Sequence, residues 1–216
     1  MPSSKRADLV LSGGGVKGIA LVGAAAALAD AGYEAQRISG TSAGAFVGAI
    51  LAAATAAGRV KVPDLEQLAM DIDYASFLDQ GPVERVPLLG PAVGVLTGDG
   101  IYRGDALHNW LVKNLAEFGV RTFADLAIDD DGLPPEQRYR LVVTVADVSI
   151  GQLVRLPWDY QRLYGLNPDE QLVADAVRAS TAIPFFYRPA TLISADGREA
   201  TLVDGGLLSN FPIDSL

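Results

Sequence analysis

The sequence of 216 residues contains no cysteine and only one histidine. Without cysteine, disulfides, thiolate catalysis and zinc sites with cysteine ligands are excluded, although the redox compartment stays open. A single histidine removes most other metal sites as well. We therefore expect neither a metal nor a disulfide framework.

Basic residues are also scarce, with 17 Lys and Arg against 26 Asp and Glu and a formal net charge of -9. Phosphate binding normally shows as clustered Lys and Arg, so nucleic acid is not expected as a partner. The net charge would not attract an anionic bilayer either. Any membrane contact would have to rest on local apolar surface.

Long hydrophobic runs are missing. The longest Ala-rich stretches, residues 19–31 and 43–57, fall short of the roughly 20 residues that cross a bilayer, which favours buried helices. The apolar run after Lys5 and Arg6 ends at three glycines and predicts a strand, not a signal peptide. We expect a cytoplasmic protein with at most peripheral membrane contact, and the sequence does not indicate its oligomeric state.

The N-terminal quarter repeats one pattern twice. Residues 7–12 form an apolar run that ends at glycines before a helical pattern over 16–31, and residues 36–39 stop at Gly40 before a helical pattern over 43–57. Two strand-turn-helix units predict an α/β fold whose mostly parallel sheet carries helices on both faces. The two turns should meet at the carboxyl edge of that sheet, where ligands bind in such folds.

The rest of the chain suggests a continuation of the same domain. Strands are predicted over residues 139–146, 153–156 and 201–203, with the first two forming a hairpin, and helices over 64–73, 105–118 and 169–181. An apolar loop over residues 81–100 either packs over a core edge or forms a flap or a contact with an acyl chain. The length suits one domain over residues 1–216.

Residues 40–44 (GTSAG) fit the G-x-S-x-G nucleophile elbow, in which small flanking residues permit a strained turn that exposes the serine hydroxyl. A helix that begins just after Ser42 would direct the positive end of its dipole and free amides at a forming oxyanion. The alternative is an ordinary helix start with Ser42 as a cap.

Residues 13–18 (GGGVKG) also admit two interpretations. Consecutive glycines at a helix start can present amides to an oxyanion, with Lys17 adding positive charge nearby. The same residues fit the dinucleotide fingerprint G-x-G-x-x-G, which expects an acidic residue about 20 positions further on. Asp30 and Glu34 come too early for that role, and the serine elbow occupies the expected place.

A serine nucleophile needs a base. His108 lies in a helical pattern and is interpreted as structural, which disfavours a Ser-His-Asp triad. Asp204 follows an apolar strand and precedes Gly205 and Gly206, so its carboxylate should lie at the same sheet edge as the elbow. Its ordinary pKa is low for a base, and partial burial would have to raise it. The alternative is a simple Asp-Gly turn.

In this order, the GGGVKG loop, the GTSAG elbow and the late Asp-Gly-Gly resemble the patatin-like phospholipase family. Residues 143–151 (VTVADVSIG), 176–184 (AVRASTAIP) and 204–212 (DGGLLSNFP) are also similar to family segments, so the resemblance covers nearly the whole chain.

The resemblance implies a three-layer α/β/α sandwich and a lipid acyl hydrolase that cleaves fatty acyl esters, with phospholipids as the expected substrates, through an acyl-serine intermediate. It implies Ser42 as nucleophile and Asp204 as general base of a Ser-Asp dyad, with no metal or organic cofactor. It also implies further site residues, namely the oxyanion-hole glycines Gly13, Gly14, Gly15 and Gly18 and the supporting motif residues Lys17, Gly40, Gly44, Gly205 and Gly206.

One departure from the family pattern is the end of the sequence at Leu216, soon after Asp204, where relatives continue with further helices. Truncation at the C-terminus therefore stays open. Two alternatives from other classes also stay open: a dinucleotide-binding module built on residues 13–18 and an acyl-lipid-binding protein with a vestigial site. The apolar residues 81–100 and 185–187 suggest contact with an acyl chain or a bilayer.

Overall fold

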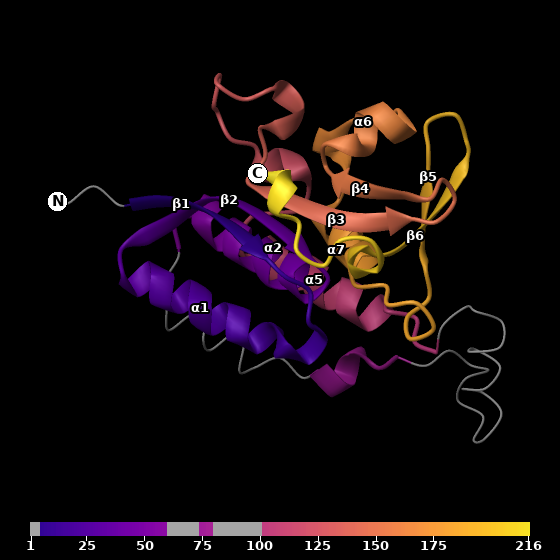
Figure 1. The fold of residues 1–216 in the computed structure, drawn as a ribbon, viewed down its shortest axis with the longest axis horizontal. Coiled ribbons are helices and arrows are strands. Elements are labelled where there is room, and N and C mark those ends of the chain that lie inside the picture. Colours follow the sequence, from indigo (N-terminus) through magenta and orange to yellow (C-terminus); the bar gives the residue numbers. More distant parts are fainter. Residues whose placement is uncertain (1–4, 60–73, 80–100) are drawn as a thin grey trace.

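A computed structural model of the protein describes residues 5–59, 74–79 and 101–216 (Figure 1). The helix predicted over residues 64–73 and the apolar loop predicted over residues 81–100 lie outside the described residues.

The two predicted N-terminal strand-turn-helix units are present, but the second strand is longer than residues 36–39 and continues through Gly40. Strand β1 (Lys5–Leu11) leads through a 3-10 turn, η1 (Gly15–Gly18), into helix α1 (Ile19–Asp30), and strand β2 (Tyr33–Thr41) leads directly into helix α2 (Ala43–Ala56). β1 pairs with β2 in parallel.

The remaining regular elements complete one mixed sheet and its helices. The strands are β3 (Leu141–Asp147), β4 (Gln152–Leu156), β5 (Ala190–Ile193) and β6 (Glu199–Asp204), and the helices are α5 (Asp105–Glu117), α6 (Asp159–Tyr164) and α7 (Val173–Ser180). Short 3-10 turns lie between them: η2 (Tyr74–Phe77), η3 (Phe123–Leu126), η4 (Pro135–Gln137), η5 (Pro168–Glu170), η6 (Gly205–Leu207) and η7 (Ile213–Ser215).

The sheet has the order β1-β2-β3-β6-β5, and β4 pairs with β3 off this path. Strands β1, β2, β3 and β5 run in one direction, while β4 and β6 run in the other. Residue Val143 pairs with Gly40 of β2 and Leu156 of β4, so these two strands flank β3 on opposite sides. Val145 pairs with β4 and with Asp204 of β6, which places β6 on the same side as β2.

Strands β2 and β6 therefore lie along the same edge of β3 and run toward each other. β2 ends at Thr41, paired with Thr144, and β6 ends at Asp204, paired with the next residue, Val145. This register brings the carboxyl ends of two strands from distant parts of the sequence face to face.

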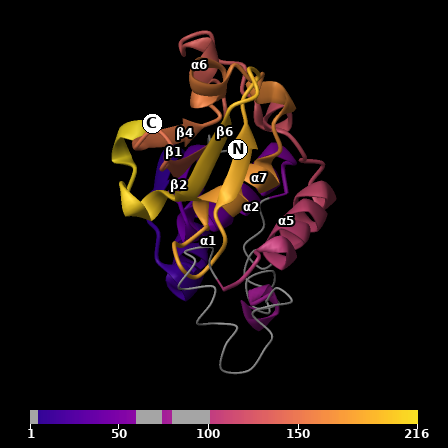
Figure 2. The same ribbon diagram turned by 90° about the vertical axis from the view of Figure 1, so that its right-hand side faces the viewer.

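Helices cover both faces of the sheet, which confirms the predicted three-layer α/β/α arrangement. Figure 1 shows α1, α2, α5 and α7 below the sheet and α6 above β4, and Figure 2 shows the same separation after a quarter turn. The central helix is α2, in which every residue from Gly44 to Thr55 is buried. It carries no charged residue and packs on β1, β2 and β3, so it forms the middle of the core.

Three expectations need correction. Helix α1 is not buried along its length, because only Ala25 and Ala26 are buried within it. The helix predicted over residues 169–181 begins at Val173, since Leu172 is extended and forms a bridge with Thr122. The final strand is longer than residues 201–203 and pairs with β5, a strand that was not predicted.

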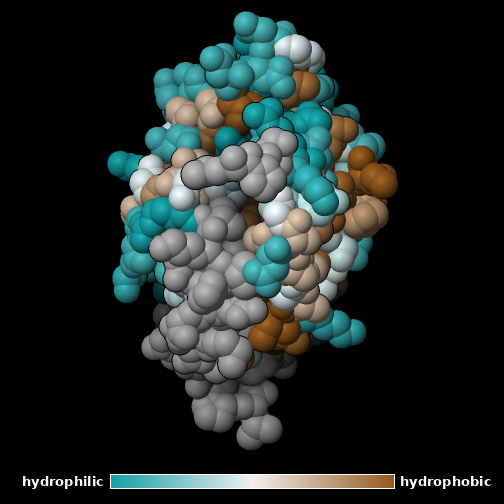
Figure 3. All heavy atoms as spheres, turned by 90° about the vertical axis from the view of Figure 1, so that its left-hand side faces the viewer, coloured by the Kyte–Doolittle hydropathy of each residue, from teal (hydrophilic) through white to brown (hydrophobic). Residues whose placement is uncertain are grey.

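In the part of the chain that the structure describes, none of the helices combines the length and the apolarity that crossing a bilayer needs. Figure 3 shows the face on the left-hand side of Figure 1, where hydrophilic residues cover most of the upper part and hydrophobic residues gather in smaller areas.

Candidate active site

Ser42 occupies a strained turn between β2 and α2. Its backbone has φ 54° and ψ -120°, a conformation that a residue with a side chain rarely adopts and that costs about 1–3 kcal/mol. A Cβ added at Gly40 would lie 2.4 Å from the carbonyl oxygen of Gly44, and one added at Gly44 would lie 2.2 Å from that of Leu11. Both glycines are required because the backbone passes this close on either side of Ser42.

The side chain of Ser42 does not cap α2, although the residue lies at the N-cap position. Instead, its hydroxyl lies close enough to the carboxylate of Asp204, which ends β6, to lower the pKa of that carboxylate. Ser42 is 6% exposed and Asp204 5% exposed. The structure thus brings together the two residues that sequence reasoning had paired, at the point where β2 and β6 meet.

The carboxylate of Asp204 is buried and partly satisfied. Burial raises the pKa of Asp204 above its ordinary value of 3.8, while the hydrogen bonds from the Ser42 hydroxyl and the Gly206 amide act in the opposite direction. The Gly206 N–H donates to Oδ1 at 2.7 Å, so Asp204 lies in a tight turn as well as facing Ser42. Gly205 is needed here because an added Cβ would lie 2.4 Å from Thr144 O.

A second serine holds the backbone of the elbow. The Ser42 N–H donates to Ser180 Oγ at 2.9 Å, and Ser180 Oγ donates to Thr144 O at 2.7 Å. Ser180 is fully buried at the end of α7. Ser180 lies in the segment AVRASTAIP, which resembles a family segment but carries no signal that predicts this role.

The glycine loop lies against the elbow. A Cβ added at Gly13 would lie 3.3 Å from the Cβ of Ser42 and 2.2 Å from Asn210 Oδ1. The Gly13 N–H is engaged, because it donates to Asn210 O at 3.0 Å. In the 3-10 turn η1 that follows, the first backbone hydrogen bond is donated by Lys17 N–H to Gly14 O at 3.2 Å. The amides of Gly14 and Gly15 come before this bond in the chain.

The other two residues predicted around this loop have different surroundings. Gly18 is buried, and a Cβ added there would lie 3.2 Å from the Cβ of Ala43, so this glycine permits close packing of η1 on the start of α2. Lys17 is exposed at the surface.

A groove of about 180 Å³ opens beside Ser42 and Gly15 and is mostly apolar. Its walls come from the glycine loop, α2, η2, α5 and the segment after α7. The lining residues are Gly15, Val16, Gly18, Ser42, Ala43, Phe46, Val47, Phe77, Leu78, Leu107, Thr181, Ile183, Phe186 and Tyr187. Such a groove can hold an apolar chain whose end lies at the Ser42 hydroxyl.

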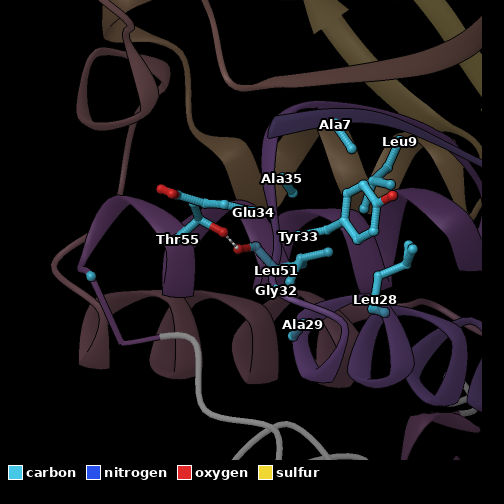
Figure 4. Close-up of a pocket in the computed structure, with 12 residues that line it drawn as sticks. Ala7, Leu9, Leu28, Ala29, Gly32, Tyr33, Glu34, Ala35, Leu51 and Thr55 are labelled. Atoms are coloured by element: carbon cyan, nitrogen blue, oxygen red, sulfur yellow. Dashed lines mark hydrogen bonds between the residues drawn. The ribbon is translucent and has the colours of Figure 1, made fainter. Parts of the chain in front are cut away.

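A larger hollow of about 310 Å³ lies elsewhere, between α1, α2 and the first residues of β1 and β2 (Figure 4). Tyr33 and Leu28 stand on one side of it, and Glu34 and Thr55 on the other. Thr55 Oγ1 donates to Leu51 O within its own helix. Because the lining residues include neither Ser42 nor Asp204, the smaller groove is the better candidate for the active site.

His108 contacts Asp175 and not Ser42. Its Nε2 lies 2.6 Å from Asp175 Oδ1, which links α5 to α7. No group of three or more His, Asp or Glu side chains that could hold a metal ion occurs within residues 5–59, 74–79 and 101–216.

Comparison with known proteins gives consistent matches. The family model described as patatin-like phospholipase matches residues 9–216. The protein YqhO of Bacillus subtilis is 40% identical over 207 residues, which cover 95% of this chain and 65% of YqhO. Human patatin-like phospholipase domain-containing protein 6 is 30% identical over 208 residues, which cover 95% of this chain and 12% of that protein.

The crystal structure of VipD from Legionella pneumophila has a similar fold, with a TM-score of 0.54 at 23% sequence identity. The match covers 98% of this chain and 47% of VipD. The chain thus spans less than two thirds of the length of each of these three proteins.

Proposed function

This chain belongs to the patatin-like phospholipase family, and on that premise we propose that it is a lipid acyl hydrolase that cleaves fatty acyl esters with Ser42 and Asp204. The observation that carries the proposal is that Ser42 and Asp204, both buried, meet where β2 and β6 end, at the side of an apolar groove. A lone cap or an Asp-Gly turn would not need these two side chains to meet.

In the proposed reaction, Asp204 takes the hydroxyl proton while Ser42 Oγ attacks the ester carbonyl carbon. The carbonyl oxygen becomes an oxyanion, which the amides of Gly14 and Gly15 and the N-terminus of α2 stabilise. The tetrahedral intermediate collapses, the alcohol leaves with the proton from Asp204, and an acyl-serine remains. Asp204 then takes a proton from water as the water oxygen attacks the acyl-serine, and this second tetrahedral intermediate collapses to the fatty acid as Ser42 Oγ leaves and takes the proton back from Asp204.

The raised pKa of Asp204 supports its role as base. An ordinary carboxylate is a weak acceptor for a serine proton, and burial makes this one more basic. The remaining difference in basicity between Asp204 and the serine oxygen is offset at the substrate. There, preorganised amides stabilise the negative charge that forms on the oxyanion.

Phospholipids are the proposed substrates, and a lipid surface is the proposed place of contact. Four side chains that line the groove are also exposed: Val16, Leu78, Ile183 and Phe186. Next to them, Phe185 is 60% exposed and has a backbone φ of 67°. A large aromatic side chain held in solvent by a strained backbone supports a role in contact with lipid.

The decisive experiment for the reaction combines a lipid panel with a fluorophosphonate probe. Wild type should hydrolyse acyl esters and be labelled, and Ser42→Ala should do neither, because the nucleophile is gone. Labelling that persists in Ser42→Ala would remove the assignment. Tight binding of NAD or NADP without esterase activity would favour the dinucleotide-binding alternative, and lipid binding without turnover would favour a vestigial site.

The contact with lipid is tested on phosphatidylcholine vesicles by sedimentation. Phe185→Ser should bind vesicles more weakly than wild type because it removes exposed aromatic surface beside the groove. Ile193→Ser is the matched control, since Ile193 is also exposed, at 51%, but lies on β5. Equal vesicle binding by the two variants would contradict the proposed contact.

A further inference from the structure

The backbone of Gly13 is held at its N–H and at its carbonyl oxygen by one residue from the far end of the chain. The Gly13 N–H donates to the backbone oxygen of Asn210 at 3.0 Å, and Asn210 Nδ2 donates to the carbonyl oxygen of Gly13 at 3.3 Å. The two residues are 197 positions apart. Asn210 has a donor and an acceptor on the same short side chain, together with its own backbone carbonyl, which suits it to this task.

Asn210 reaches the glycine loop from the segment that carries Asp204. This segment is fixed at the elbow, because Thr41 Oγ1 donates to Ser209 O at 3.0 Å and lies 2.6 Å from Thr144 Oγ1. The next residue, Asn210, then turns to Gly13. The chain after Asp204 therefore connects the elbow to the glycine loop through two adjacent residues.

The two glycines nearest to Asn210 leave room for its side chain. Asn210 Oδ1 would lie 2.2 Å from a Cβ added at Gly13 and 3.2 Å from one added at Gly206. Gly206 is also the residue whose amide donates to Asp204. Asn210 thus lies between the loop proposed to bind the oxyanion and the turn that holds the proposed base.

We propose that Asn210 is a positioning residue, which fixes the Gly13 peptide so that the amides of Gly14 and Gly15 are directed at the oxyanion formed on Ser42. This inference rests on the proposed function. The physical reason is that oxyanion donors act only when they are held in place before the reaction, and glycines restrain their own backbone poorly. A displacement of about 1 Å in such a site can lower the rate about 100-fold.

The chemistry of Asn210 separates this role from simple anchoring. Asn210→Asp keeps the size of the side chain but replaces the donor to Gly13 O with an acceptor, so it should repel that carbonyl. Asn210→Ala removes the side-chain bond and keeps the bond from Gly13 N–H to the backbone oxygen. Asn210 is exposed, so neither variant leaves a cavity, and both should fold with a melting temperature close to that of wild type.

The experiment measures kcat and KM on a soluble p-nitrophenyl ester, with hydrogen exchange of the peptide over residues 12–16 in parallel. Both variants should lower kcat by about 10- to 100-fold with little change in KM, and should exchange the loop amides faster. Ser209→Ala is the matched control, because the contact described for Ser209 is made by its backbone oxygen. It should behave like wild type in both measurements.

Unchanged exchange over residues 12–16 in both Asn210 variants would overturn the inference, whether or not the protein is active. Faster exchange with wild-type kcat would overturn it as well, because the loop would then be held for another purpose. Ser209→Ala showing the same loss of kcat and the same faster exchange would also overturn the inference. An inactive wild type that fluorophosphonate does not label at Ser42 would instead refute the proposed function, so the two failures are distinguishable.

Discussion

The two members of the proposed dyad come from two differently built halves of the sheet. Ser42 follows β2 in the parallel half, and its turn depends on glycines two positions before and after it. Asp204 ends β6, which runs antiparallel to β3, and its place depends on the pairing of Asp204 with Val145. The nucleophile is thus positioned by a local motif and the base by strand register.

This comparison predicts that the two halves respond differently to substitution. A change at Asp204 should remove chemistry and leave the fold intact, a change at Ser180 should affect both, and a change at His108 should affect neither very much.

The largest effect is expected for Asp204→Asn, which keeps the shape of the side chain and removes the base. Turnover of acyl ester should fall by about 10²- to 10⁴-fold, the usual contribution of general base catalysis. Steady-state kinetics with circular dichroism as a folding control measure this. Near wild-type turnover by the folded variant would show that Asp204 is not the base.

The same variant tests the pH dependence. Activity of wild type should rise with pH through the raised pKa of Asp204, so its acid limb should lie above the ordinary value of 3.8. Between these two pKa values the folded protein retains a proton that the unfolded chain releases, so stability should fall as pH rises through this window. Asp204→Asn should lack both dependences, and chemical denaturation at several pH values checks the second.

An intermediate effect is expected for Ser180→Ala. The change leaves the buried Ser42 N–H and Thr144 O without their partner, which should lower the free energy of unfolding by about 1–3 kcal/mol. Because the elbow loses its support, kcat should fall as well. Ser194→Ala is a suitable control, since Ser194 is also buried but bonds to Asp196 and Arg198. If both variants keep wild-type kcat, Ser180 has only a structural role.

The smallest effect is expected for His108→Ala. Its contact with Asp175 is partly exposed, so the loss of stability should stay below about 1 kcal/mol, and kcat should not change. A thermal melt and an esterase assay measure the two quantities. A loss of activity as large as that of Asp204→Asn would restore a histidine triad.

The two N-terminal strand-turn-helix units could be predicted from the sequence because their signals are local. Glycines mark both turns, and an uninterrupted apolar pattern marks the buried helix α2. The same reasoning was wrong for α1, whose composition is equally apolar but of which the structure buries only Ala25 and Ala26. Composition indicates a helix, and only packing decides which of its faces is covered.

In the C-terminal half, long-range contacts decide more of the structure than local sequence signals do. The hairpin of β3 and β4 was predicted, but β5 was missed, and the helix that begins at Val173 was placed too early. Leu172 is extended and forms a β-bridge with Thr122, which is 50 positions earlier in the sequence. A prediction from neighbouring residues alone cannot detect such a contact.

The sequence by itself determined the kinds of group available for chemistry: with no cysteine and one histidine, it offered a serine between glycines and an aspartate before glycines. The tertiary structure alone decided that these two residues meet. Strands β2 and β6 lie along the same edge of β3, and their last residues pair with neighbouring residues of β3. It also decided that Ser180 and Asn210 support the elbow and the glycine loop. Hydrogen bonds between such distant residues depend on register, and register is set by the packing of the whole sheet.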